Sequence, residues 1–80
     1  MEDEEIIREI EDIALRIAKK RKYEIAGTTY VDFDSDFWSA VYETTLSYPR
    51  PEREQLQEYL RNMDDEEEDR IVQNVYANIG

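Results

Sequence analysis

Four isoleucines, Ile6, Ile10, Ile13 and Ile17, recur at spacings of four, three and four residues. This spacing places their side chains along one side of an α-helix, and the pattern predicts a helix over residues 5–22. An apolar stripe of this length must be covered by other apolar elements. The feature therefore favours a fold in which further helices pack around the first one.

The ends of this predicted helix differ in charge. Acidic residues crowd its start, whereas Lys19, Lys20, Arg21 and Lys22 crowd its end. The helix dipole favours this polarity. The basic cluster also fits a nucleic-acid or targeting patch, but the acidity of the rest of the chain favours the dipole explanation.

Three further helices are predicted, at about residues 35–47, 51–62 and 65–78. Asp34 and Asp64 stand at N-cap positions, where a carboxylate accepts hydrogen bonds from backbone N–H groups. Each segment carries an apolar stripe at helical spacing. The expected fold class is therefore mainly α, a small four-helix domain over residues 1–80.

Residues 23–33 have a different character. Thr28, Thr29, Tyr30 and Val31 favour a strand, and Ala26-Gly27 offers a turn. A short β-hairpin near residues 23–33 is the resulting prediction. A two-stranded hairpin is marginal alone, so we expect it to pack on a helix.

The composition excludes most catalytic chemistry. The 80 residues contain no Cys and no His, so a Ser/His/Asp or Cys/His catalytic group is impossible. No glycine loop for phosphates is present, because the chain has two glycines in all. We expect a protein that is not an enzyme and that holds no cofactor or metal.

Asp32, Asp34, Asp36 and Glu43 match positions 1, 3, 5 and 12 of an EF-hand calcium loop. Phe37 stands at position 6, where the loop needs a glycine with positive φ. The segment also has the apolar pattern of a helix rather than a loop. These mismatches weigh against a calcium site.

The formal net charge is −11, from 21 acidic and 10 basic residues. Such a chain is expected to avoid nucleic acid and anionic membranes and to favour basic partners, foremost a nucleic-acid-binding protein. No apolar run reaches the roughly 20 residues of a membrane helix, and the acidic start is unlike a signal peptide. The expected location is the cytoplasm, that of the host cell if a phage encodes the protein. The sequence leaves the oligomeric state open.

One function that fits this charge is nucleic-acid mimicry, in which carboxylates replace phosphates in a basic groove. Duplex DNA carries about one charge per 1.7 Å. Residues 1–18 carry net −5 over about 27 Å of helix, or one charge per roughly 5 Å, so several acidic segments must converge. The candidate partner-binding residues are Asp32, Asp34, Asp36, Glu43, Tyr30, Tyr42, Trp38, Asp64, Asp65, Glu66, Glu67, Glu68 and Asp69.

In size, acidity and Trp/Tyr content the chain is similar to the general type of phage-encoded anti-restriction and anti-CRISPR inhibitors. That type is a function shared by unrelated folds, and no motif of it maps onto residues here. An immunity protein or antitoxin that neutralises one toxin is the main alternative. A structural or designed helical protein with a solvated acidic surface, and adaptation to high salt, also stay open.

Overall fold

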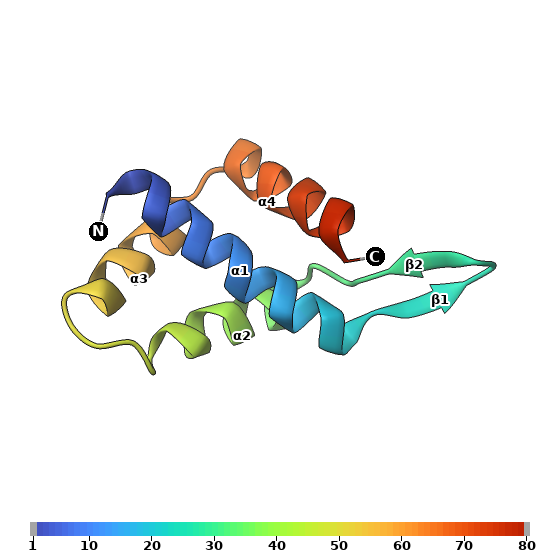
Figure 1. Ribbon diagram of the computed structural model, residues 1–80, viewed down its shortest axis with the longest axis horizontal. Helices are drawn as coiled ribbons and strands as arrows, with labels where there is room; N and C mark the ends of the chain where they lie inside the picture. Colours follow the sequence, from blue (N-terminus) through green and yellow to red (C-terminus); the bar gives the residue numbers. More distant parts are fainter. Residues whose placement is uncertain (1, 80) are drawn as a thin grey trace.

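The computed structural model describes residues 2–79 (Figure 1). Within this range the chain forms four helices and one two-stranded antiparallel hairpin, which confirms the predicted fold class. In chain order these elements are α1 (Asp3–Arg21), β1 (Tyr23–Ile25), β2 (Thr28–Tyr30), α2 (Ser35–Thr45), α3 (Glu52–Asn62) and α4 (Asp65–Asn78).

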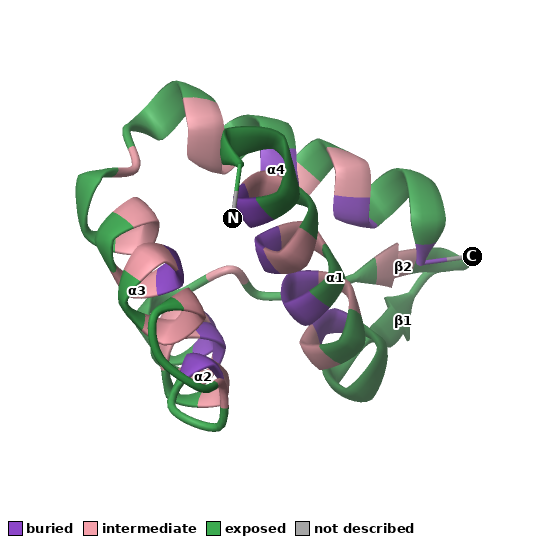
Figure 2. Cartoon of the chain, turned by 60° about the vertical axis from the view of Figure 1, so that its left-hand side comes forward, coloured by how far each residue is buried: buried purple, intermediate pink, exposed green. Residues whose placement is uncertain are grey.

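Helix α1 is the centre of the domain. It packs against α4 and against the pair formed by α2 and α3, whereas α4 makes its helix–helix contacts with α1 (Figure 1). The buried residues face these contacts (Figure 2). They are Ile6, Ile10, Ile13, Ala14 and Ala18 of α1, Val31, Phe37, Val41, Leu56, Ile71, Val75 and Ile79.

The isoleucine stripe of α1 supplies most of its buried surface, as predicted. Ile10 and Ile13 are fully buried, and Ile17 is half-buried against the core. Burial of a side chain of this size contributes about 1.5–3 kcal/mol to the hydrophobic stabilisation. Ala14 and Ala18 are also buried, and their small side chains let neighbouring elements come close to the α1 backbone.

The helix caps form as predicted. Oδ1 of Asp34 accepts a hydrogen bond of 2.9 Å from the backbone N–H of Phe37, and Oδ1 of Asp64 accepts one of 2.9 Å from Glu67. Helix α2 ends at Thr45 rather than near residue 47. Its last turn tightens there, because the backbone N–H of Tyr48 bonds to the carbonyl of Thr45, three residues back, at 3.0 Å.

The hairpin turn uses two residues with positive φ, Ala26 at 52° and Gly27 at 81°. Two such residues in a two-residue loop match the twist of the flanking strands. The strands pair Tyr23 with Tyr30 and Ile25 with Thr28. The expectation that the hairpin packs on a helix is wrong. Neither strand contacts a helix, and the hairpin projects from the end of the helical part (Figure 1).

The segment between β2 and α2 anchors the base of this hairpin. Val31 is buried, and its carbonyl accepts a hydrogen bond of 3.2 Å from the hydroxyl of Tyr76 in α4. The Phe33 ring lies edge-on to Phe37 and to Tyr76, with centroids 4.7 and 5.4 Å away. These contacts fix where the hairpin leaves the helices.

Candidate functional site

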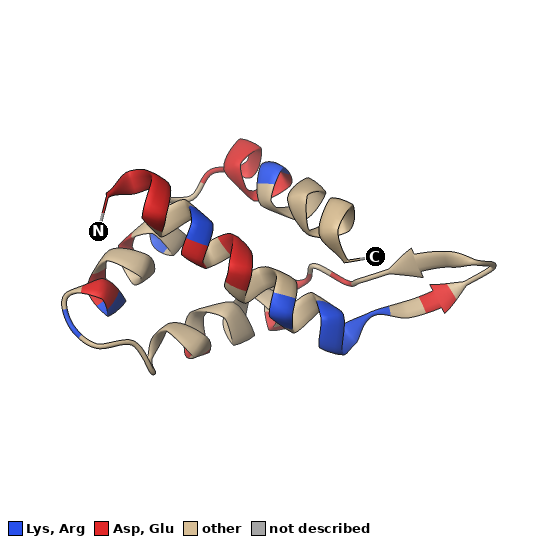
Figure 3. Cartoon of the chain, viewed as in Figure 1, with Lys and Arg blue, Asp and Glu red and all other residues tan. Residues whose placement is uncertain are grey.

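Charge is unevenly distributed over the molecule (Figure 3). Acidic residues gather where α1 begins and at the start of α4, and basic residues dominate the last turn of α1, whereas α3 carries residues of both signs. We call the end of the molecule where α1 and α4 begin the acidic end. Its central residues are Asp3 and Glu11 of α1, Glu58 and Tyr59 of α3, Asp64 before α4, and Glu67 in the first turn of α4.

An open groove runs between α1 and α3 at the acidic end. Carboxylates from two helices border it, because Asp3 comes from the first turn of α1 and Glu58 from the middle of α3. Ile6 and Tyr59 also line the groove, together with Gln55 and Asn62. The lining therefore combines acidic, apolar and amide side chains.

Several charged side chains lie close enough to the Tyr59 hydroxyl to influence its pKa. Partial burial is the largest cause that raises the pKa of Tyr59, and the negative charge of Glu67 is the second. Glu11 and Asp64 raise it as well, whereas Arg70 opposes them. Carboxylates from α1 and from the start of α4 thus act on one side chain of α3.

These carboxylates are not neutralised by ion pairs. Among residues 2–79 the ion pair that forms is Arg50 Nε to Glu54 Oε1 at 3.3 Å, with both side chains largely exposed. Glu11 accepts a neutral hydrogen bond of 2.7 Å from Nδ2 of Asn74. Asp3, Glu58 and Asp64 are exposed, so their charge is open to a partner.

The aspartates of residues 32–36 lie elsewhere, at the base of the hairpin. Asp32 accepts a hydrogen bond of 3.4 Å from the Tyr23 hydroxyl, Asp34 caps α2, and Asp36 lies in the first turn of α2. Tyr30 is exposed and stacks on Tyr23 with centroids 6.1 Å apart.

Glu43 faces basic residues rather than other acids. It borders a hollow together with Lys20 and Arg21 from the last turns of α1. Among the described residues, Glu43 forms no ion pair with either of these two within 4 Å, but the nearby positive charges make this hollow less similar to a phosphate surface than the acidic end.

Trp38 and Tyr42 line a third region, a groove between α2 and the end of α3 that includes Leu60 and Met63. Trp38 is half-buried, packs on the core, and lies edge-on to Phe37 at 5.3 Å. Its indole N–H is buried and finds no hydrogen-bond partner among the described residues. The Trp38 side chain thus serves mainly as packing.

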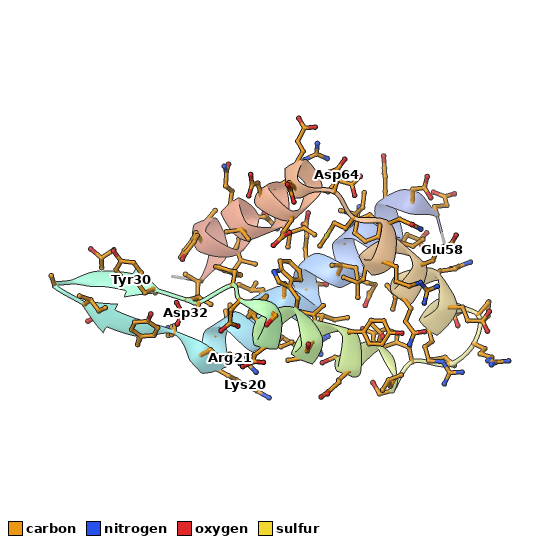
Figure 4. All side chains as sticks on the ribbon, turned by 180° about the vertical axis from the view of Figure 1, so that it is seen from behind. Lys20, Arg21, Tyr30, Asp32, Glu58 and Asp64 are labelled. Carbon is orange, nitrogen blue, oxygen red and sulfur yellow. The ribbon has the colours of Figure 1, made fainter. Side chains whose placement is uncertain are left out.

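The predicted partner-binding residues consequently fall into separate groups. The acids of residues 64–69 lie at the start of α4, whereas Asp32 lies near Tyr76 at its end. The 13 residue steps of α4 span about 20 Å. Figure 4 places Asp64 with Glu58 at one end of the molecule, and Asp32 with Tyr30 toward the other.

Sequence reasoning missed Asp3, Glu11, Glu58 and Tyr59. Glu58 was not singled out, because residues 49–63 carry three acids and three bases and so have no net charge. Asp3 was not singled out, because the helix dipole already explains why acids begin α1. The adjacent pair Glu58-Tyr59 in an amphipathic helix was the available signal, because one residue faces solvent while the next faces a neighbouring helix.

The described residues contain no group of three or more His, Cys, Asp or Glu arranged to hold a metal ion. No helix within residues 2–79 combines the length and the apolar character needed to cross a membrane. No protein-family model matches the chain, and neither curated proteins nor solved structures give a match. Fold and site together describe a small acidic helical domain with a projecting hairpin.

Proposed function

We propose that this protein is a non-enzymatic inhibitor that mimics nucleic acid, and that its acidic end occupies the basic groove of a nucleic-acid-binding protein. The observation that carries the proposal is that carboxylates from α1, α3 and the start of α4 lie around Tyr59, and that none of them is in an ion pair within residues 2–79. Acids that served only as helix caps and dipole partners would not need to meet at one place.

Charge density supports mimicry once the three helices are combined. Asp3 and Glu11 are eight residues apart, or about 12 Å along α1. Together with Glu58, Asp64 and Glu67 they make five negative charges, and Arg70 reduces the net to four. Three helices thus contribute charge around Tyr59, whereas α1 alone carries about one charge per 5 Å and duplex DNA about one per 1.7 Å.

The chemistry of recognition follows from this arrangement. Carboxylates accept charge-assisted hydrogen bonds from Lys and Arg, as phosphates do. Tyr59 adds a half-buried aromatic ring to the lining of the same groove, and such amphipathic rings are frequent anchors in protein interfaces. The expected targets are nucleoproteins of a host defence system, and the inhibitor is then of anti-restriction or anti-CRISPR type, encoded by a phage or mobile element.

A pull-down from bacterial lysate at low salt tests the proposal. The tagged protein is the bait, bound proteins are identified by mass spectrometry, and duplex DNA is added as competitor. Mimicry predicts capture of a nucleic-acid-binding protein that duplex DNA displaces. A partner that stays bound in excess DNA contradicts mimicry and favours the alternative, an immunity protein or antitoxin with a dedicated interface.

A further inference from the structure

The end of the molecule opposite to the acidic end carries an exposed apolar patch. The described residues include five large apolar side chains that are at least 40% exposed. Three of them belong to the hairpin, and a fourth, Tyr76, lies at its base. Tyr23, Ile25, Tyr30 and Tyr76 are 40%, 56%, 44% and 41% exposed. We call these four residues the hairpin patch.

The strand register places three members of the hairpin patch on one face. Tyr23 and Tyr30 are directly opposite each other and their rings stack, and Ile25 follows Tyr23 by two residues. Glu24 and Thr29 form the other face. Tyr76 joins at the base, because its hydroxyl bonds to the carbonyl of Val31, the residue after Tyr30.

Nothing in the described chain covers this face. The hairpin projects beyond the helices (Figure 1), and neither strand packs against a helix. A two-stranded hairpin alone is marginally stable in water, and a grouped apolar surface is typical of an interaction site. The hairpin patch is therefore a candidate surface for a partner from outside the chain.

Local charge indicates which partner fits. Lys19, Lys20, Arg21 and Lys22 end α1 and are all exposed. The acids at this end are Glu24 in the hairpin, Asp32, Asp34 and Asp36 at its base, and Glu43, which borders a hollow with Lys20 and Arg21. Four positive and five negative charges leave this end close to balance, in a molecule with net charge −11.

A second copy of the chain also carries −11, so its approach to the acidic end is opposed by repulsion. At the nearly balanced end, the basic residues of one copy can face the acids of the other. A two-fold interface requires such a self-complementary surface. Polyanions and strongly basic proteins gain less here, because each meets nearly as many like charges as opposite ones.

We propose that two copies associate through the hairpin patch, with the faces that carry Ile25 and Tyr30 packed together about a two-fold axis. The longest dimension of the chain is 43 Å, and α1 separates Asp3 from Arg21 by about 27 Å. The Debye length is about 8 Å at physiological salt. Association at the hairpin therefore leaves both acidic ends outward and screened from each other, and it does not depend on the proposed inhibitory function.

Sedimentation equilibrium of the full chain, from micromolar to millimolar concentration, tests this proposal. The mass per chain is 9.6 kDa, and the expected result is a transition to twice that mass. Added NaCl screens both the net repulsion between two copies and the contacts between facing basic and acidic residues, so the affinity of the dimer should change by less than about tenfold. A dimer that NaCl weakens by much more than that would instead indicate head-to-tail contact between basic and acidic ends, and it would overturn the proposal.

Two variants with the same charge change locate the interface. Ile25→Lys places a lysine in the hairpin patch, and Thr29→Lys places one on the opposite face, across from Glu24. Ile25→Lys should weaken the dimer by about 30-fold or more, as expected for an interface hot spot, whereas Thr29→Lys should have little effect. Tyr30→Thr, which keeps strand propensity, should also weaken it.

Circular dichroism melting checks that the variants fold. The hairpin makes no helix contacts through its strands, so all three variants should melt like the unmodified chain at a concentration where that chain is a monomer. A monomer at every concentration, or a dimer that withstands both Ile25→Lys and Tyr30→Thr, would refute association through the hairpin patch.

Discussion

The hydroxyl of Tyr48 donates a hydrogen bond of 2.8 Å to Oε2 of Glu9, 39 residues earlier in the chain. This bond ties the connection between α2 and α3 to the middle of α1. Tyr48→Phe removes the bond and keeps the ring, so it should lower the free energy of unfolding by about 1 kcal/mol. Urea denaturation measures this change. Tyr42→Phe is the matched control, since the Tyr42 hydroxyl makes no hydrogen bond within residues 2–79, and an equal loss in both variants would contradict the role of Glu9.

Alkaline pH should destabilise the fold through two tyrosines. Burial raises the pKa of Tyr48, with the hydrogen bond to Glu9 as the second cause, and burial and Glu67 raise that of Tyr59. A tyrosine with a raised pKa in the folded state stabilises the fold below the ordinary value near 10, and this contribution is lost as pH rises above it. Stability should therefore fall more steeply above pH 10 in the unmodified chain than in the double variant Tyr48→Phe, Tyr59→Phe. Equal slopes in urea denaturation at stepped pH would refute this assignment.

Two substitutions at Asp34 separate its role as the N-cap of α2 from the effect of its negative charge. Asp34→Ala removes the acceptor of the Phe37 N–H bond and should cost about 1 kcal/mol of stability. Asp34→Asn keeps an acceptor oxygen and removes the charge, so it should retain most of that stability. Thermal or urea unfolding of both variants checks the prediction, which fails if Asn destabilises as much as Ala.

The hairpin turn should tolerate a better residue at position 26. Ala26 has a positive φ of 52°, which alanine adopts at a cost and asparagine adopts more readily. Ala26→Asn creates Asn-Gly, the preferred sequence for such a turn. Hydrogen exchange of the strand amides should slow, whereas exchange in α1 should not change. Faster exchange in the hairpin would contradict the assigned turn.

Local sequence signals were sufficient for most of the fold. The isoleucine spacing identified α1, the caps at Asp34 and Asp64 placed the starts of α2 and α4, and Ala26-Gly27 placed the turn. The direction of the hairpin was not predictable in this way. It depends on the contacts of Val31 and Phe33 with Tyr76, residues more than 40 positions apart.

The candidate site was predictable only in part. The acidic run of residues 64–69 lies at the acidic end, but the other residues of that end come from α1 and α3. A count of charges along the sequence cannot show which helices contact each other. Glu43 illustrates the same difficulty. It stands in a segment without any basic residue, yet the fold places it beside Lys20 and Arg21.

The most direct test of the central claim compares two sets of neutralised acids for binding to the protein captured in the pull-down. The first set is Glu58→Gln, Asp64→Asn and Glu67→Gln at the acidic end, where Asn preserves the cap at residue 64. The second set is Asp32→Asn, Asp36→Asn and Glu43→Gln, which removes the same charge from the other predicted group.

Each set is combined in one triple variant, and titration calorimetry at low salt measures the affinity of each triple variant for that partner. Mimicry by the acidic end predicts that the first set weakens binding by at least about tenfold, because interfacial charge pairs are lost, while the second set binds like the unmodified chain. Loss of binding in the second set, with binding retained in the first, would contradict the account.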